Sequence, residues 1–307
     1  MSRTKKSEGG KNLKKINKNR HVFIMDKNHP PALKVESGSI VTFETYDCFQ
    51  NQITKEEQSM EALDWDHINP ATGPLFIEEA EPGDVLKIEI QRIEVNPYGV
   101  IAAIPGAGLM GDQVQTSTVK VLPIKGDKVI FNENIHLPLE PMIGVIGVAP
   151  KGEGVPCGTP GAHGGNMDNK KIKEGTTLFL PVYQKGALLS MGDLHGAMGD
   201  GEVMVSGVEV GGEVSVKVQV LKGPSISNPI LEDQEYYYTI ASHKELLEAV
   251  KIAAADMQKL VMRELDLSFN EAGMLLSAAG NAEVCQVVDP LVTARFGFPK
   301  YLMKSFL

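Results

Sequence analysis

The densest group of polar residues in the sequence lies at residues 192–202. Asp193 and His195 are two positions apart, so on an extended strand both side chains leave the same face and form a two-point chelate. Asp200 and Glu202 repeat this spacing beyond a glycine-flanked turn, and could face the same cavity from the other arm of a hairpin. Carboxylate oxygens and imidazole nitrogens suit zinc, iron(II) or manganese. The pattern predicts a divalent metal site; the alternative is a polar turn beside a hydrogen-bonded surface histidine.

A second cluster begins around the paired glycines Gly164 and Gly165, which would let the backbone come close to a ligand. Its polar members are His163, Asn166 and Asp168, which supply imidazole, amide and carboxylate groups. Taken alone, the segment is typical of an ordinary turn before a strand. Together with the first cluster, it predicts a second set of ligands.

Four isolated residues could also take part in chemistry. Asp47 follows a β-like run, where it could be a metal ligand or could cap a turn. Cys48 would need an adjacent base to act as a nucleophile, and the local sequence supplies no histidine, so a small buried core residue is the favoured role for Cys48 and Cys157. Glu140 lies between prolines among apolar residues, where burial would raise its pKa toward that of a general acid or base; its alternative is a carboxylate at a rim.

The elements that position these residues are expected to be β-strands. The 31 glycines and 18 prolines are spread through the first two thirds of the chain, which is typical of an all-β region with many tight turns. In residues 85–95 apolar and polar side chains alternate, which predicts an antiparallel strand with one buried and one wet face. Residues 206–214 indicate a hairpin that turns at Gly211 and Gly212. The predicted strands are residues 32–35, 39–45, 85–95, 119–122, 128–130, 176–182, 203–210 and 214–221.

Helical patterns follow in the last third of the chain. Ser242 and Glu245 have the spacing of a capping box, and apolar residues at helical spacing continue to about Leu265, which predicts one long amphipathic helix. Ser268 and Glu271 repeat the capping box. They predict a second, shorter helix that ends at a Gly-Asn pair.

Composition limits the class of protein. Hydrophobic residues make up 42% and charged residues 22% of the 307 residues, which argues against disorder and coiled coil. No run approaches the ~18 apolar residues of a membrane span, and no apolar segment follows the basic N-terminus, so we expect neither a membrane anchor nor a secretory signal. The three cysteines are far apart without C-x-x-C spacing, which favours the reducing cytoplasm.

Charge is distributed unevenly along the chain. Residues 1–20 hold eight of the 30 Lys and Arg residues but one of the 39 Asp and Glu residues. The acidic remainder would repel phosphate backbones, which argues against a nucleic acid partner. Residues 1–20 are predicted to be a solvated, disordered basic tail.

Five segments together resemble the acetamidase/formamidase family of bacterial amidohydrolases. They occur in family order across roughly residues 21–300, and five concurrent motifs are far more specific than one. Met198 departs from the family pattern, in which we expect a polar residue, often glutamine, at this position. The matching segments are residues 45–48, 69–74 continuing into 80–84, 142–150, 164–168 and 192–202.

The resemblance implies a mainly β fold, a jelly-roll-like β-sandwich with a smaller C-terminal α+β portion. It also implies metal dependence and hydrolysis of short aliphatic amides, such as acetamide and formamide, to a carboxylate and ammonia. We expect residues 21–225 to form the amidase core with the metal site, residues 226–307 to form the α+β subdomain, and the protein to be a homodimer or higher homo-oligomer. The metal is expected to be zinc, with calcium, manganese and iron as alternatives.

The expected mechanism is metal-assisted acyl transfer, in which a bound water attacks the amide. A carboxylate must take the proton of this water and return it to the departing nitrogen, because an amide leaves readily as ammonia. The expected metal ligands are Asp193, His195, Asp47, Asp168 and His163. The catalytic carboxylates are expected among Glu202, Glu140 and Asp200, and the groups that contact the substrate or its oxyanion among Gly164, Gly165 and Asn166.

Two other classes of protein remain open. A metal-dependent oxygenase on a cupin-like jelly roll also uses histidine and carboxylates, but expects H-x-H or H-x-D, and here Asp193 precedes His195. A non-catalytic metal- or sugar-binding sandwich would present exposed aromatic residues for stacking, which fits poorly with a single Trp and 6% aromatic residues. A serine hydrolase is disfavoured because no G-x-S-x-G motif occurs.

Overall fold

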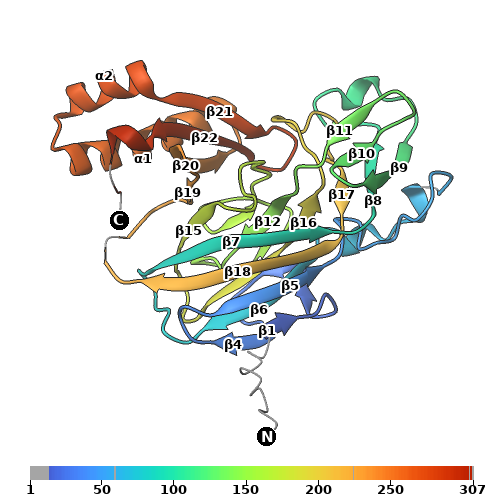
Figure 1. The fold of residues 1–307 in the computed structure, drawn as a ribbon, viewed down its shortest axis with the longest axis horizontal. Coiled ribbons are helices and arrows are strands. Elements are labelled where there is room, and N and C mark those ends of the chain that lie inside the picture. Colours follow the sequence, from blue (N-terminus) through green and yellow to red (C-terminus); the bar gives the residue numbers. More distant parts are fainter. Residues whose placement is uncertain (1–13, 59, 224, 304, 306–307) are drawn as a thin grey trace, which may run out of the picture.

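A computed structural model describes residues 14–307 except 59, 224, 304, 306 and 307, and two β-sheets form its body (Figure 1). The apolar residues of both sheets meet in one core, where Leu86 and Ile88 share a cluster with Leu189, Met191 and Leu194. The prediction of a mainly β fold, a jelly-roll-like sandwich with a smaller α+β portion, is confirmed. No helix of the described residues has the length and apolar character needed to cross a membrane.

The first sheet contains nine strands of the described residues. Buried and partly exposed residues alternate along its central strands, as the sequence pattern predicts for a sheet with one wet face. In spatial order, the strands are β1 (Lys14–Ile16), β5 (Ile40–Thr45), β18 (Gly212–Leu221), β7 (Val85–Val95), β15 (Thr177–Pro181), β19 (Ile230–Glu232), β20 (Tyr236–His243), β22 (Val292–Pro299) and β21 (Asn281–Gln286).

The second sheet has eleven strands of the described residues. Eight are in the order β11 (His136–Pro138), β10 (Lys128–Ile130), β9 (Thr118–Lys125), β8 (Tyr98–Ala103), β17 (Glu209–Val210), β16 (Ala187–His195), β12 (Met142–Gly147) and β14 (Gly164–Asn166). The other three are β6 (Ala71–Ile77), which pairs with β16, and β2 (His21–Val22) and β4 (Leu33–Val35), which pair with β6. A separate pair is formed by β3 (Ile24–Met25) and β13 (Val155–Pro156).

Two helices, α1 (Leu246–Leu265) and α2 (Phe269–Ala279), lie against β20 and β22 at one end of the molecule (Figure 1). The capping box of α2 is confirmed, since Ser268 and Glu271 make both of its hydrogen bonds. The capping box predicted for α1 is wrong. Ser242 belongs to β20, and Glu245 is an N-cap whose side chain makes no capping hydrogen bond. Short 3₁₀ turns occupy Met60–Ala62, Trp65–His67, Gly111–Gln113 and Lys300–Leu302.

The prediction of a disordered tail over residues 1–20 is wrong for its described part. Lys14–Ile16 pairs in parallel with β5, and Ile16 is buried in the sandwich core, because an apolar residue within the basic run can join the sheet edge. Residues 1–13 lie outside the described residues. At the other end of the chain, the described part of residues 226–307 contains α1 and α2, and its four strands extend the first sheet through the pairing of β15 with β19.

The predicted strand at residues 203–210 is reduced to β17, and the predicted hairpin at Gly211 and Gly212 does not form. β17 pairs with β16 and β8 in the second sheet, whereas β18 pairs with β5 and β7 in the first. The glycines therefore lie where the chain crosses from one sheet to the other. This crossing places β17 beside the end of β16.

Candidate active site

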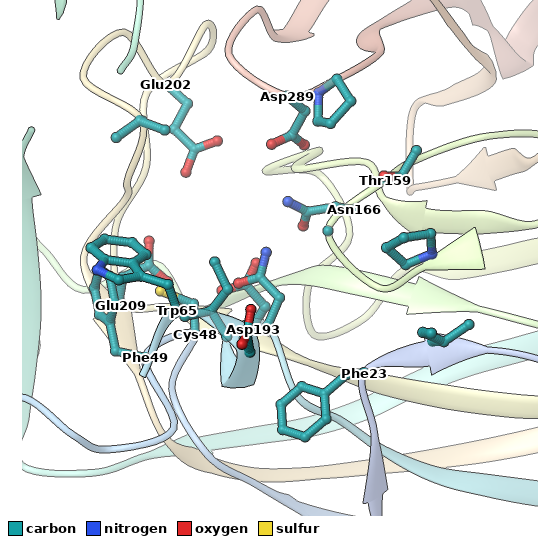
Figure 2. A pocket seen from close by; sticks show the side chains of 18 of the residues that line it. Phe23, Cys48, Phe49, Trp65, Thr159, Asn166, Asp193, Glu202, Glu209 and Asp289 are labelled. Carbon is teal, nitrogen blue, oxygen red and sulfur yellow. The ribbon is translucent and has the colours of Figure 1, made fainter. Parts of the chain in front are cut away.

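A cavity of about 660 Å³ opens beside the ends of β16 and β17. Its polar side includes Asn166, Glu202 and Asp289, whose side chains point into the same space from three different segments (Figure 2). Its other polar residues are Cys48, Asp66, Asn69, Thr159, Asp193 and Glu209. The apolar side is formed by Phe23, Ile24, Phe49, Trp65, Ile68, Ile104, Pro156, Val205 and Pro290. A small, mainly apolar molecule with one polar end fits such a cavity.

The sheet register brings the principal side chains together. His195 and Glu209 are paired residues of the antiparallel strands β16 and β17. Asp193 lies two positions before His195 with a φ of 53° in the left-handed region, and its carboxylate still reaches the imidazole. The predicted pairing of Asp193 with His195 therefore exists, although the strand is not regular there.

His195 is surrounded by carboxylates and is almost completely buried. Its Nε2 lies 3.2 Å from Glu209, 3.5 Å from Asp193, 3.7 Å from Asp168 and 4.0 Å from Glu202. Its Nδ1 lies 3.3 Å from the sulfur of Met198, so the residue that departs from the family pattern contacts the back of the imidazole. His195 and Asp168 lie beneath the cavity wall, whereas the other three acids line it.

Glycine in β12 makes room for this cluster. A Cβ built on Gly144 would be 2.8 Å from the Asp193 carbonyl oxygen and 3.0 Å from the Asp193 carboxylate, and would also collide with the Asp168 carboxylate. Any larger residue would therefore push the two acids apart. Asp168 and Glu202 also have positive φ values, 40° and 50°, which a non-glycine residue keeps only where the surrounding structure holds it.

Burial dominates the electrostatics of the cluster. It raises the pKa of Glu202 to about 8 and the pKa of Glu209 to about 7, and it raises the pKa of Asp168 well above its usual value, with the Glu202 charge acting in the same direction. Burial alone would lower the pKa of His195, but the charges of Glu209 and Asp193 raise it well above its usual value. Burial would also raise the pKa of Asp193, but the charge of His195 lowers it below its usual value. Glu202, Glu209 and Asp168 therefore favour a bound proton or another cation.

The structure does not bring every predicted ligand into this cluster. Asp47 is buried, but its carboxylate accepts a 2.6 Å hydrogen bond from the Asn51 backbone N–H, so it caps a turn. Burial lowers the pKa of His163 to about 4. His163 lines no part of the cavity and joins neither group of potential ligands found among the described residues.

The predicted contacts of the glycine pair with an oxyanion also lack support in the geometry. Gly164 and Gly165 belong to β14, and the Gly164 N–H donates to the carbonyl of Gly161. Neither glycine lines the cavity. Asn166 does, and its side-chain oxygen has no hydrogen-bond partner among the described residues.

Two predicted catalytic carboxylates lie outside the cavity. Glu140 is exposed, so the burial predicted for this carboxylate is absent. Asp200 is also exposed and points away from the cluster, where it forms ion pairs with Arg295 and Lys170. Asp200 and Glu202 do not share a face because the chain between them turns through Gly201 with a φ of 98°.

Two residues of the site were missed by sequence reasoning. Glu209 was included in a predicted strand without a role, although a carboxylate between Val208 and Val210 in a buried strand is the signal that could have identified it. Asp289 comes from the loop between β21 and β22 and lines the cavity. Nothing in its local sequence indicates which part of the sandwich it meets.

The donor set fits a divalent cation. Asp168, His195 and Glu202 offer ligand atoms within 4.8 Å of one another, and so do Cys48, Asp193 and Glu209. Buried oxygens of Asp168, Asp193 and Glu209 have no hydrogen-bond partner among the described residues. Buried charges of one sign need compensation, and this mixture of carboxylate, imidazole and thiol suits zinc or another transition metal.

The metal-free protein should be less stable at pH 8 than at pH 5. Glu202 and Glu209 have an ordinary pKa of 4.5 when unfolded and pKa values of about 8 and about 7 when folded, so the folded state binds more protons between these values. The free energy of unfolding must then fall as pH rises through this interval. Thermal unfolding of chelator-treated protein measures this, and added zinc should raise the Tm most at pH 8. A metal-free Tm that rises from pH 5 to pH 8 would contradict the assignment.

A cavity whose wall includes buried acids around a histidine is typical of an enzyme active site. The chain belongs to the acetamidase/formamidase family, whose model matches residues 11–156 and 151–267. Members of this family are amidohydrolases. The resemblance inferred from the sequence is therefore confirmed.

Solved structures share the whole fold. An acetamidase from Bacillus halodurans is 48% identical with a TM-score of 0.92, over 94% of this chain and 97% of that chain. A predicted acetamidase/formamidase from Thermoanaerobacter tengcongensis is 49% identical with a TM-score of 0.94, over 96% and 98%. A putative formamidase from Schizosaccharomyces pombe is 28% identical over 63% of this chain, which spans 62% of that relative's length.

Proposed function

We propose that this protein is a metal-dependent amidohydrolase that cleaves short aliphatic amides, such as acetamide and formamide, to a carboxylate and ammonia. The observation that carries the proposal is the buried group of Asp168, Asp193, Glu202 and Glu209 around His195, at the polar side of the cavity. Similar proteins named acetamidase and putative formamidase support the choice of substrate.

The residues that would hold the metal are Asp168, Asp193, His195 and Glu209, with Cys48 as a further donor. When bound there, a divalent ion supplies polarisation of the amide carbonyl and acidification of a water. Asp193 and His195 are held by β16 and Glu209 by β17, whereas Asp168 and Cys48 lie outside the strands, and the space above Gly144 accommodates Asp168 and Asp193. The ionisable side chains of the site are therefore buried and already close together before a metal binds.

Glu202 is the best candidate for the residue that moves protons. It lines the cavity, lies next to the cluster, and has a pKa raised by burial to about 8. Its carboxylate would accept a proton from the attacking water as the carbon–oxygen bond forms. It would then give that proton to the amide nitrogen as the carbon–nitrogen bond breaks, so that ammonia leaves.

The remaining wall of the cavity would bind the substrate. The side-chain oxygen of Asn166, which has no hydrogen-bond partner among the described residues, can accept a hydrogen bond from the amide N–H, while Phe23, Phe49 and Ile68 can contact the acyl chain and exclude water. A thiol nucleophile is disfavoured. Burial raises the pKa of Cys48 well above its usual value, which keeps the thiol protonated.

The proposal is tested by ammonia release from formamide, acetamide and propionamide, with the metal content measured on the same sample. We expect hydrolysis to disappear after treatment with a chelator and to return with added zinc or manganese, because the acid cluster lacks its cation without them. Undiminished turnover by metal-free protein would refute metal dependence. Metal-loaded protein that releases no ammonia from any of the three would refute this substrate class.

Zinc as the metal, a cytoplasmic location, a homo-oligomeric assembly and the division at residue 225 stay predictions. Three buried, unpaired cysteines support a reducing compartment. The presence of a thiol beside carboxylates and a histidine supports zinc over calcium, since calcium prefers oxygen ligands alone.

A further inference from the structure

We propose that Arg295 is a positioning residue that sets the separation of Asp168 and Glu202 by holding the two loops that carry them. The inference rests on the proposed function, because it concerns the geometry of the same site. Arg295 lies on β22, is almost completely buried and does not line the cavity. It therefore acts through its neighbours and not on the substrate.

The first loop held by Arg295 carries Glu202. Arg295 donates from Nη1 to one carboxylate oxygen of Asp200 at 3.0 Å and from Nη2 to the other at 2.8 Å. Such a two-pronged contact fixes direction as well as distance, because the guanidinium is planar. Asp200 is two residues from Glu202, so the contact limits where the loop can place the Glu202 carboxylate.

The second loop carries Asp168. The same Nη1 of Arg295 donates to the side-chain oxygen of Asn169 at 3.0 Å, and Asn169 is completely buried. Asn169 follows Asp168 directly in the chain. One nitrogen of one side chain is therefore shared between the neighbours of two acids that face His195 from different loops.

Backbone hydrogen bonds also hold the loop of Glu202 against the end of β21. The N–H of Gly201 donates to the carbonyl of Cys285 at 2.8 Å, and the N–H of Val287 donates to the carbonyl of Gly201 at 3.2 Å. The N–H and the carbonyl of Gly201 thus attach the loop of Glu202 to the end of β21 and to the residue that follows it. The positive φ values of Asp168 and Glu202 need such external support, because neither residue prefers this conformation.

Arg295 has another ion pair that provides a matched control. Its Nε donates to Glu283 at 2.6 Å, and Glu283 lies on β21, which carries none of the acids around His195. The side chains of Glu283 and Asp200 are 28% and 33% exposed, so their removal should cost similar amounts of folding free energy. Of these two ion pairs of Arg295, only the pair with Asp200 involves the loop that carries Glu202.

The test compares Asp200→Asn with Glu283→Gln in the full-length protein. Changes to residues that support metal ligands typically weaken metal binding or activity by about 10–100-fold. We expect Asp200→Asn to lower zinc affinity and kcat for acetamide by about this factor with little change in KM. Glu283→Gln should leave both within about twofold of the unchanged protein, because the loops keep their contacts. Lys170→Gln, which removes the other ion pair of Asp200, should resemble Glu283→Gln.

Zinc titration of metal-free protein, steady-state kinetics and thermal unfolding are measured on each variant. Equal small losses of Tm in Asp200→Asn and Glu283→Gln, with zinc affinity and kcat unchanged in both, would overturn the proposal and leave Arg295 a structural role only. A defect in Lys170→Gln equal to that of Asp200→Asn would also overturn it. If the unchanged protein hydrolyses no amide, the proposed function fails, but zinc affinity still decides the role of Arg295.

Discussion

Replacement of His195 with alanine is expected to remove most of the bound metal and to abolish amide hydrolysis. His195 faces all four acids through Nε2 at 3.2–4.0 Å, so without it the donor set loses its imidazole and keeps only acids and a thiol. The loss should exceed the ~10–100-fold typical of changes to residues that merely support ligands. Metal analysis of the purified variant and ammonia release from acetamide measure the two effects.

His163→Ala is the matched control, since His163 is also a buried histidine but belongs to neither ligand group. It should keep its metal. Thermal unfolding of His195→Ala must show a cooperative transition, so that metal loss can be separated from loss of the fold. A folded His195→Ala protein that retains a full complement of metal would exclude His195 as a principal ligand.

Sequence patterns predicted strands with one solvent-exposed face better than strands that are buried on both faces. β7 begins and ends where alternation predicted, at Val85–Val95, because one of its faces is wet. β12 and β16 carry or support the site, yet all of their residues are buried, so alternation is absent. Buried strands of this kind cannot be separated from other apolar runs by periodicity alone.

The site was predictable where its residues are neighbours in sequence. Asp193 and His195 were identified from two-residue spacing, and the structure places their side chains 3.5 Å apart. Glu209 reaches His195 through strand pairing, and Arg295 reaches the loop of Glu202 from 93 positions further along the chain. These contacts depend on sheet register and on the packing of the C-terminal strands, which local patterns do not specify.

Glutamine in place of Glu202 is expected to separate proton transfer from metal binding. The change removes the charge but keeps the volume and much of the hydrogen bonding, so the fold should be retained. General acid–base assistance contributes roughly 10²–10⁴-fold, and kcat for acetamide should fall by about that factor with little change in metal content. Any acid-side fall in kcat that depends on ionisation of Glu202 should also be absent from the pH profile of the variant.

Glu140→Gln is the matched comparison, since the same chemical change is made on an exposed carboxylate that does not line the cavity. It should leave kcat and its pH dependence intact. Near-normal turnover in Glu202→Gln would refute its role in proton transfer. Loss of metal from Glu202→Gln would instead identify Glu202 as a ligand, which the 4.0 Å approach of its carboxylate to His195 permits, and the proton acceptor would then be sought at Asp289, across the cavity (Figure 2).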